Sequence, residues 1–175
     1  MAERPEAWLR GPIEGVDPYL IPVAHALLQA GDDVQRAVGG LTVDELWARP
    51  GGAASIGFHL EHIAGATDRL LTYARGEALS EEQFRALKAE GDPGEPRAGA
   101  TELVGATLAA LETAMTQLRR TSPATLLEER EVGRSRLPTT VLGLLFHAGE
   151  HATRHTGQII TTARIVRARR DDVRE

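Results

Sequence analysis

Four long segments with apolar residues at helical spacing constrain the fold of this chain more than any other feature of its sequence. Their apolar positions recur three or four residues apart, which is the period of an α-helix with one buried face. Alanine and leucine are abundant, while aromatic residues make up only 4% of the 175 residues, and this favours helices over strands. Four amphipathic helices in a chain of this length predict an all-α fold, a four-helix bundle.

Capping residues and chain-breaking residues set the expected limits of these helices. Ser, Thr and Asp accept hydrogen bonds at helix starts, proline is tolerated at the first helical position, and Gly or Ser-Pro ends a helix. The first helix is therefore expected to start at Asp17-Pro18 and end at Gly39, and the second to start at Ser55 and end before Gly76. The third is expected to stop before Ser122-Pro123, and the fourth to run from Thr139 or Thr140 to about Arg169.

Two further sequence patterns predict short additional helices in the connections. Thr42 with Glu45, and Ser80 with Gln83, form capping boxes, in which each side chain accepts from the backbone of the other residue. The second short helix is expected to end at about Glu90.

Residues 123–138 are expected to form a mostly irregular crossover. With no internal repeat, we expect one domain over residues 1–175, with its core at about 17–169.

Composition excludes several classes of function. The chain has no cysteine, so disulfides, thiolate zinc sites and a cysteine nucleophile are excluded, and any metal is left to nitrogen and oxygen ligands. The net charge of −5 argues against a nucleic-acid partner. No run of about 18 apolar residues predicts a membrane-spanning helix, and the first residues lack the pattern of a signal peptide, so we expect no membrane partner and a cytoplasmic protein.

Three of the six histidines lie in one stretch of the last helix. His147, His151 and His155 are four residues apart, and each step of four turns about 40° around a helix, so the three fan across one side. Leu144 shares this side, which indicates that the histidines point inward.

Stacked inward imidazoles are unfavourable both when neutral and unpaired and when protonated. A divalent cation offsets this cost, and two imidazoles at this spacing can reach one ion at about 2.0–2.1 Å. The second helix offers His59 and His62 as a further ligand, and spacing alone does not choose between them. Three imidazoles with open positions are typical of a catalytic site, for which zinc and nickel are both reasonable.

Two other metal motifs fit the sequence less well. His147, Glu150 and His151 match the H-x-x-E-H string of one class of zinc peptidases, in which the glutamate is the base. This interpretation leaves His155 and the second helix without a role. The paired Glu-x-x-His motif of di-iron bundles is absent from these helices.

Two segments carry a resemblance to a known family. Ser55 is followed seven residues later by His62 and the continuation HIAGATDRLLTYARG, and the last helix contains HAGEHATRHTGQ. Together they resemble the DinB/YfiT-like superfamily of metal-dependent helical bundles. The resemblance implies a four-helix bundle, often paired as a homodimer, with one divalent ion held by His62, His151 and His155.

The same resemblance suggests roles for the neighbouring residues. It implies that His147 lies next to the metal ligands without being one of them, and it leaves His59 as an alternative ligand. It also places Gln158 where its amide could hydrogen-bond towards the site. Gly157 matches a position where glycine could allow close helix approach.

Relatives in that superfamily include S-transferases that use a low-molecular-weight thiol such as bacillithiol or mycothiol. The resemblance therefore implies a metal-dependent S-transferase acting on a small-molecule substrate. The alternatives are a metal-dependent hydrolase in which Glu150 or Asp68 handles protons, and a non-catalytic metal-binding stress-response protein.

Overall fold

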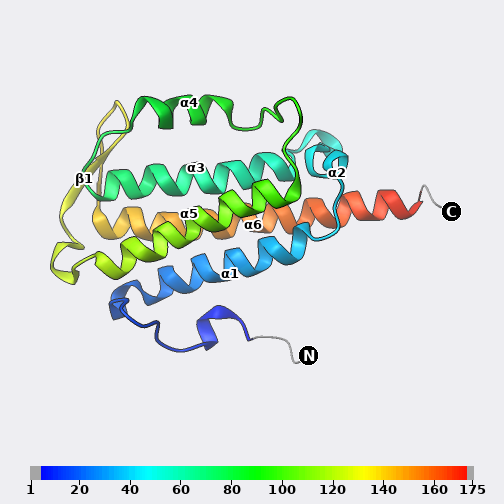
Figure 1. Ribbon diagram of the computed structural model, residues 1–175. Helices are drawn as coiled ribbons and strands as arrows, with labels where there is room; N and C mark the ends of the chain where they lie inside the picture. The colour runs from blue at the N-terminus through cyan, green and yellow to red at the C-terminus, as the bar shows by residue number, and fades with distance from the viewer. Residues whose placement is uncertain (1–4, 173–175) are drawn as a thin grey trace.

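Four long helices packed along one another form the body of the molecule in a computed structural model, which describes residues 5–172 (Figure 1). Their buried faces meet in one apolar core that includes Leu27, Leu60, Met115 and Ile159. The helical periodicity of the sequence is confirmed, and the fold is an all-α bundle. The helices are α1 (Ile21–Val38), α3 (Ile56–Ala74), α5 (Ala100–Arg120) and α6 (Val141–Asp172).

The second of these helices begins at Ser55 as predicted, whereas α1 begins at Ile21, three residues later than the expected start at Pro18. Asp17 accepts a hydrogen bond from the backbone N–H of Tyr19 at the start of a 3-10 turn, Pro18–Leu20, which leads directly into α1. Ser55 accepts from the backbone N–H of Phe58 at the start of α3.

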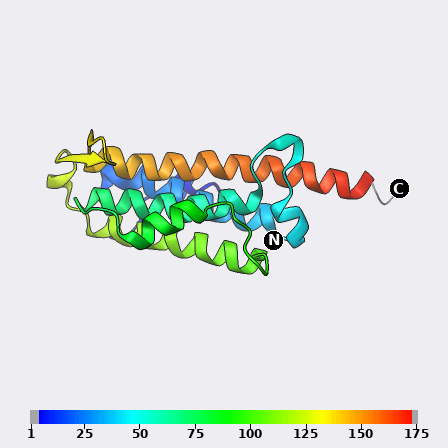
Figure 2. The same ribbon diagram turned by 90° about the horizontal axis from the view of Figure 1, so that it is seen from above.

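The last helix begins at the second of the two expected threonines and is longer than expected. The hydroxyl of Thr140 accepts from the backbone N–H of Gly143 at 3.0 Å. The helix α6 continues past Arg169 to Asp172, and its final turns extend beyond the other helices (Figure 2).

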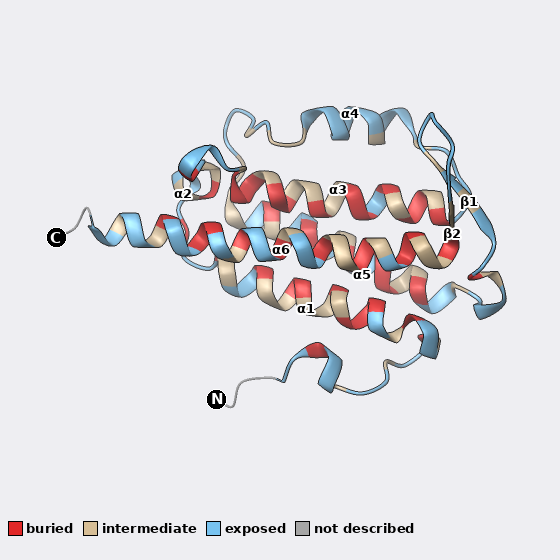
Figure 3. Cartoon of the chain, turned by 180° about the vertical axis from the view of Figure 1, so that it is seen from behind, coloured by how far each residue is buried: buried red, intermediate tan, exposed pale blue. Residues whose placement is uncertain are grey.

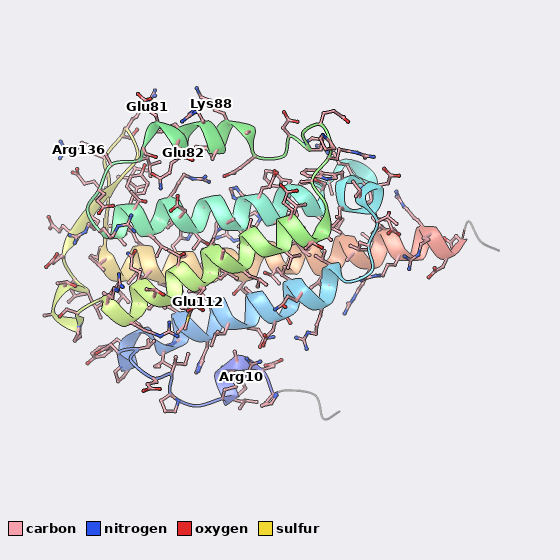
Figure 4. The ribbon with its side chains drawn as sticks, in the orientation of Figure 1. Arg10, Glu81, Glu82, Lys88, Glu112 and Arg136 are labelled. Carbon is pink, nitrogen blue, oxygen red and sulfur yellow. The ribbon has the colours of Figure 1, made fainter. Side chains whose placement is uncertain are left out.

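Both predicted short helices are present, each with both hydrogen bonds of its capping box: α2 (Val43–Trp47) and α4 (Glu81–Ala89). Helix α4 lies along the outer side of α3 and buries none of its side chains (Figure 3). Its Glu81 and Lys88 point away from α3 (Figure 4). Further 3-10 turns cover Ala7–Leu9, Pro50–Gly52 and Pro123–Thr125.

The expectation of an irregular crossover at 123–138 is wrong, because a β-hairpin forms there. Strands β1 (Glu129–Val132) and β2 (Leu137–Thr140) pair antiparallel, with Val132 opposite Leu137. Gly133 turns the chain with a φ of 69°, which glycine adopts without strain. Pro138 is tolerated because a strand with only one neighbour needs hydrogen-bond donors on one edge only.

Helices α3 and α6 run antiparallel and side by side, which brings the two histidine-bearing segments of the sequence together (Figures 1 and 3). None of the helices between residues 5 and 172 has a stretch long and apolar enough to cross a bilayer.

Candidate metal centre

His62 of α3 and His151 and His155 of α6 form a compact cluster. Each offers one ring nitrogen, and the three nitrogens lie within 4.8 Å of one another. The ring centroids are 4.9 Å apart for His62 and His151, 4.6 Å for His62 and His155, and 4.4 Å for His151 and His155. The structure thus brings together the three residues that the family resemblance selected.

The cluster lies at the border of the buried face of α6 rather than at its centre. Leu144 and Ala152 are buried in the core, whereas His151 and His155 are half-buried beside α3. The inward direction expected for the histidines is therefore only partly realised. Partial exposure leaves room for a ligand from solvent.

Burial and neighbouring positive charges keep the imidazoles of His151 and His155 unprotonated. Burial, followed by the charges of His62 and His147, lowers the pKa of His151 to about 4. Burial, followed by the charge of His151, lowers the pKa of His155 to about 4. At neutral pH both rings are neutral, which is the form in which imidazole binds a metal ion.

The Nδ1 atom of His62 donates to a buried carboxylate. It lies 2.6 Å from Oε2 of Glu90, and the other oxygen of Glu90 accepts from Nη1 of Arg69 at 2.6 Å. Burial alone would raise the pKa of Glu90, but the hydrogen bonds from His62 and Arg69 outweigh it and lower the pKa.

Sequence reasoning missed the contact with Glu90, because Glu90 was expected only as the end of a short helix. Helical phase relates residues on one helix and carries no signal for a partner 28 residues away.

His59 lies behind the cluster and is not one of its members. Its Nδ1 is 2.9 Å from Nδ1 of His155, so one of the two rings donates to the other. Burial, followed by the charge of His62, lowers the pKa of His59. Phe58 stacks on the ring of His62 with centroids 5.3 Å apart and an interplanar angle of 11°.

His147 and Glu150 lie beside the cluster on the exposed side of α6. The His147 ring is 5.4 Å from that of His151, and its Nδ1 lies 2.8 Å from Oε1 of Glu150. Arg154 donates to both oxygens of Glu150 at 2.5 and 2.8 Å, and this contact is the main reason that the pKa of Glu150 is lowered. A carboxylate stabilised in this way is a weak proton acceptor.

The remaining candidates lie away from the three rings. Asp68 accepts from the side-chain amide of Gln83 at 2.6 Å, in the groove between α3 and α4. Gln158 is exposed, and its side chain makes no hydrogen bond with any residue between 5 and 172. Gly157 faces open space, whereas Gly149 is where α6 approaches α1, since a Cβ there would lie 3.3 Å from Val23.

The donor set fits a divalent metal ion. The hydrogen bond to Glu90 occupies Nδ1 of His62 and leaves its Nε2 for coordination, and Nε2 of His155 is free in the same way when the ring of His155 is the donor to His59. Three imidazole nitrogens suit zinc, nickel and related ions, and a carboxylate partner on the far ring nitrogen, such as Glu90 for His62, is typical of such ligands.

A comparison with protein families finds a match between residues 26–159 and the family model of the DinB superfamily. The matched segment covers most of the chain and includes all three histidines of the cluster together with Glu90. A search of the curated proteins finds no match.

Proposed function

The chain belongs to the DinB superfamily, in which metal binding is common, and we propose that it binds one divalent ion through His62, His151 and His155. The observation that carries this proposal is the convergence of the three imidazoles from two helices. Zinc and nickel are the ions that this donor set favours.

We further propose that the protein is a metal-dependent S-transferase. A divalent ion held by these histidines would act as a Lewis acid and would lower the pKa of a low-molecular-weight thiol of the bacillithiol or mycothiol type. In the transfer, the thiolate sulfur forms a bond to an electrophilic carbon of the small-molecule substrate, the leaving group departs with its electron pair, and the thiol proton passes to solvent. The role of His62, His151 and His155 is binding, and no side chain acts as nucleophile.

The contacts of the two candidate bases support thiol transfer over hydrolysis. The hydrogen bonds from Arg154 lower the pKa of Glu150, and the carboxylate of Asp68 accepts from Gln83 in the groove between α3 and α4. Because the chain lacks cysteine, the thiol in this proposal is a separate small molecule.

A conjugation screen tests this activity. Purified metal-loaded protein is mixed with bacillithiol or mycothiol and a panel of alkylating or arylating electrophiles, and thioether formation is measured by mass spectrometry. Product is expected with the natural chain and not with His151→Ala, whose circular dichroism should remain unchanged. Equal turnover by both proteins would contradict the proposal. Turnover without any thiol would favour the hydrolase, and stabilisation by metal without turnover would favour the non-catalytic role.

We also propose that the protein pairs as a homodimer through the face shared by α1 and α6. Phe146 is 60% exposed beside an apolar groove of about 410 Å³ lined by Pro22, Val23 and Ala26. Large exposed apolar side chains next to such a groove are typical of an interface. Sedimentation velocity should give a dimer for the natural chain and a monomer for Phe146→Glu, and a monomeric natural chain would contradict the proposal.

A further inference from the structure

We propose that Glu90 is the positioning residue of the metal centre, which sets the ring orientation and tautomer of His62. The inference rests on the proposed metal site but concerns a residue outside the three ligands. It also makes the end of α4 part of that site, because Glu90 directly follows the last residue of this helix.

The contacts of Glu90 are those of a buried, fully engaged carboxylate. Its side chain is 8% exposed, and Arg69, which donates to it, is 10% exposed. A buried charge is strongly unfavourable without partners, so this carboxylate depends on the hydrogen bonds from both His62 and Arg69. Arg69 neutralises the charge and leaves Oε2 directed at the imidazole.

The hydrogen bond from His62 determines which ring nitrogen is free. An ionised carboxylate can only accept, so it keeps a proton on Nδ1 of His62. In the neutral ring the lone pair is then on Nε2. Phe58 stacks on the same ring and restricts its rotation, so orientation and tautomer are set by separate contacts.

Gly65 provides the space in which the carboxylate and the guanidinium meet. A Cβ at this position would lie 2.6 Å from Oε1 of Glu90 and 2.7 Å from Nη1 of Arg69, closer than real contacts allow. Gly65 lies in the interior of α3, where glycine weakens a helix, and its backbone does not require a positive φ. A Cβ here would therefore force the ends of the Glu90 and Arg69 side chains to shift.

A purely structural role for Glu90 would be to attach α4 to α3. Other contacts already serve that purpose: Gln83 donates to Asp68 and Thr72, and the backbone N–H of Gly91 donates to Glu61. An anchoring role predicts no change at the imidazole of His62, whereas the positioning role predicts a changed tautomer. This difference provides the test.

The experiment uses the full chain with Glu90→Ala, Glu90→Gln and Gly65→Ala. Glu82→Gln is the matched control, since Glu82 lines the groove between α3 and α4 and its side chain makes no hydrogen bond or ion pair with the described part of the chain. Zinc dissociation constants are measured by competition with a chelating dye. The tautomer of His62 is read from long-range 15N–1H correlation spectra of the metal-free proteins.

Zinc affinity should fall by about 10–100-fold in Glu90→Ala. It should fall by less in Glu90→Gln, because the amide oxygen still accepts from Nδ1 of His62, and it should not change in Glu82→Gln. In Gly65→Ala affinity should fall while helix content is retained, because alanine favours the helix but displaces the carboxylate. In the metal-free proteins, the Nδ1–H form of His62 should dominate in the natural chain and be lost in Glu90→Ala.

An unchanged tautomer in Glu90→Ala, or zinc affinities of Glu90→Ala and Gly65→Ala within about twofold of the control, would overturn the inference. Failure of the natural chain to bind zinc would contradict the metal site instead. The tautomer spectra, recorded without metal, would still decide the role of Glu90. If Glu90→Ala does not fold, Gly65→Ala decides the role of Glu90, since both its zinc affinity and its Nδ1–H form of His62 should then be reduced, and no change in either would overturn the inference.

Discussion

At the residue scale, the properties of the cluster follow from which ring nitrogen of each histidine is already engaged. Glu90 engages Nδ1 of His62, and His59 engages Nδ1 of His155. The two histidines of α3 thus have different places: His62 lies within the cluster, and His59 lies behind it. Their spacing in the sequence could not separate them.

This difference predicts unequal effects of replacing the two residues. His62→Ala removes a ligand, so zinc binding at micromolar concentration should be lost. His59→Ala removes only the partner of His155, and affinity should fall by about 10–100-fold with one ion per chain still bound. Zinc titration of the two variants checks this, and a greater loss in His59→Ala would reverse the assignment.

The lowered pKa values of the α6 histidines predict that the metal-free protein loses stability in mild acid. His151 and His155 have a pKa of about 4 when folded and an ordinary value of 6.5, so the unfolded chain takes up protons first as the pH falls. The contribution of these two histidines to the free energy of unfolding is complete above pH 6.5 and declines from there towards pH 4. The lowered pKa of Glu90 also makes the folded state lose stability as the pH falls, but in a lower pH range.

Urea unfolding at pH 7.5 and pH 5 measures this effect. The midpoint should be lower at pH 5 in the natural chain, and the double variant His151→Ala, His155→Ala should show a smaller difference. Equal midpoints in the natural chain would contradict these pKa shifts.

The periodicity of the sequence predicted the half of the site that lies on one helix, but not the contacts between helices. His151 and His155 could be paired because four residues separate them on α6. The contact of Glu90 with His62 depends on where α4 lies against α3, and no local pattern encodes that. Likewise, the turn at Gly133 that closes the hairpin lies among polar residues without the alternation that marks a strand.

At the scale of elements, the site depends on how the short helices hold the ends of α3. Helix α2 packs on the first turn of α3 through the indole of Trp47, whose Nε1 donates to the backbone oxygen of Ala98 at 2.9 Å. Gly57 of α3 allows this contact, since a Cβ there would lie 2.7 Å from the indole ring. Because Gly57 precedes His59 and His62 on α3, this packing also supports the histidines.

Gly57→Ala should therefore destabilise the protein, although alanine favours a helix. A clash with a rigid indole costs about 1–3 kcal/mol, and the gain in helix propensity offsets about 1 kcal/mol of it. Gly105→Ala on α5 is the control, because nothing lies within 4 Å of a Cβ there, and it should be neutral or stabilising. Urea unfolding followed by tryptophan fluorescence compares them, and equal stability would show that the indole moves freely.

At the scale of the whole molecule, the bundle brings together two helices that are distant in the sequence, and an ion held between them would stabilise the folded state. Since His62 lies on α3 and the other two proposed ligands on α6, the complete set of three imidazoles exists only when these helices are packed together. Binding to the folded state alone shifts the unfolding equilibrium by mass action.

Free zinc at about 100 times its dissociation constant should stabilise the protein by about 2.7 kcal/mol. For a chain of this size, that corresponds to a rise in Tm of about 5–10 °C. Differential scanning calorimetry with zinc and then with a chelator should show the rise and its reversal. The same Tm under both conditions would mean that no ion bridges the two helices.

Calorimetric titration of zinc into the metal-free natural chain and into His62→Ala, His151→Ala and His155→Ala tests the metal centre most directly. One ion per chain is expected for the natural protein, and loss of this binding is expected in each of the three variants, with their helix content unchanged. Binding that survives in any of these folded variants, or no binding by the natural chain, would contradict a metal centre built from these three histidines.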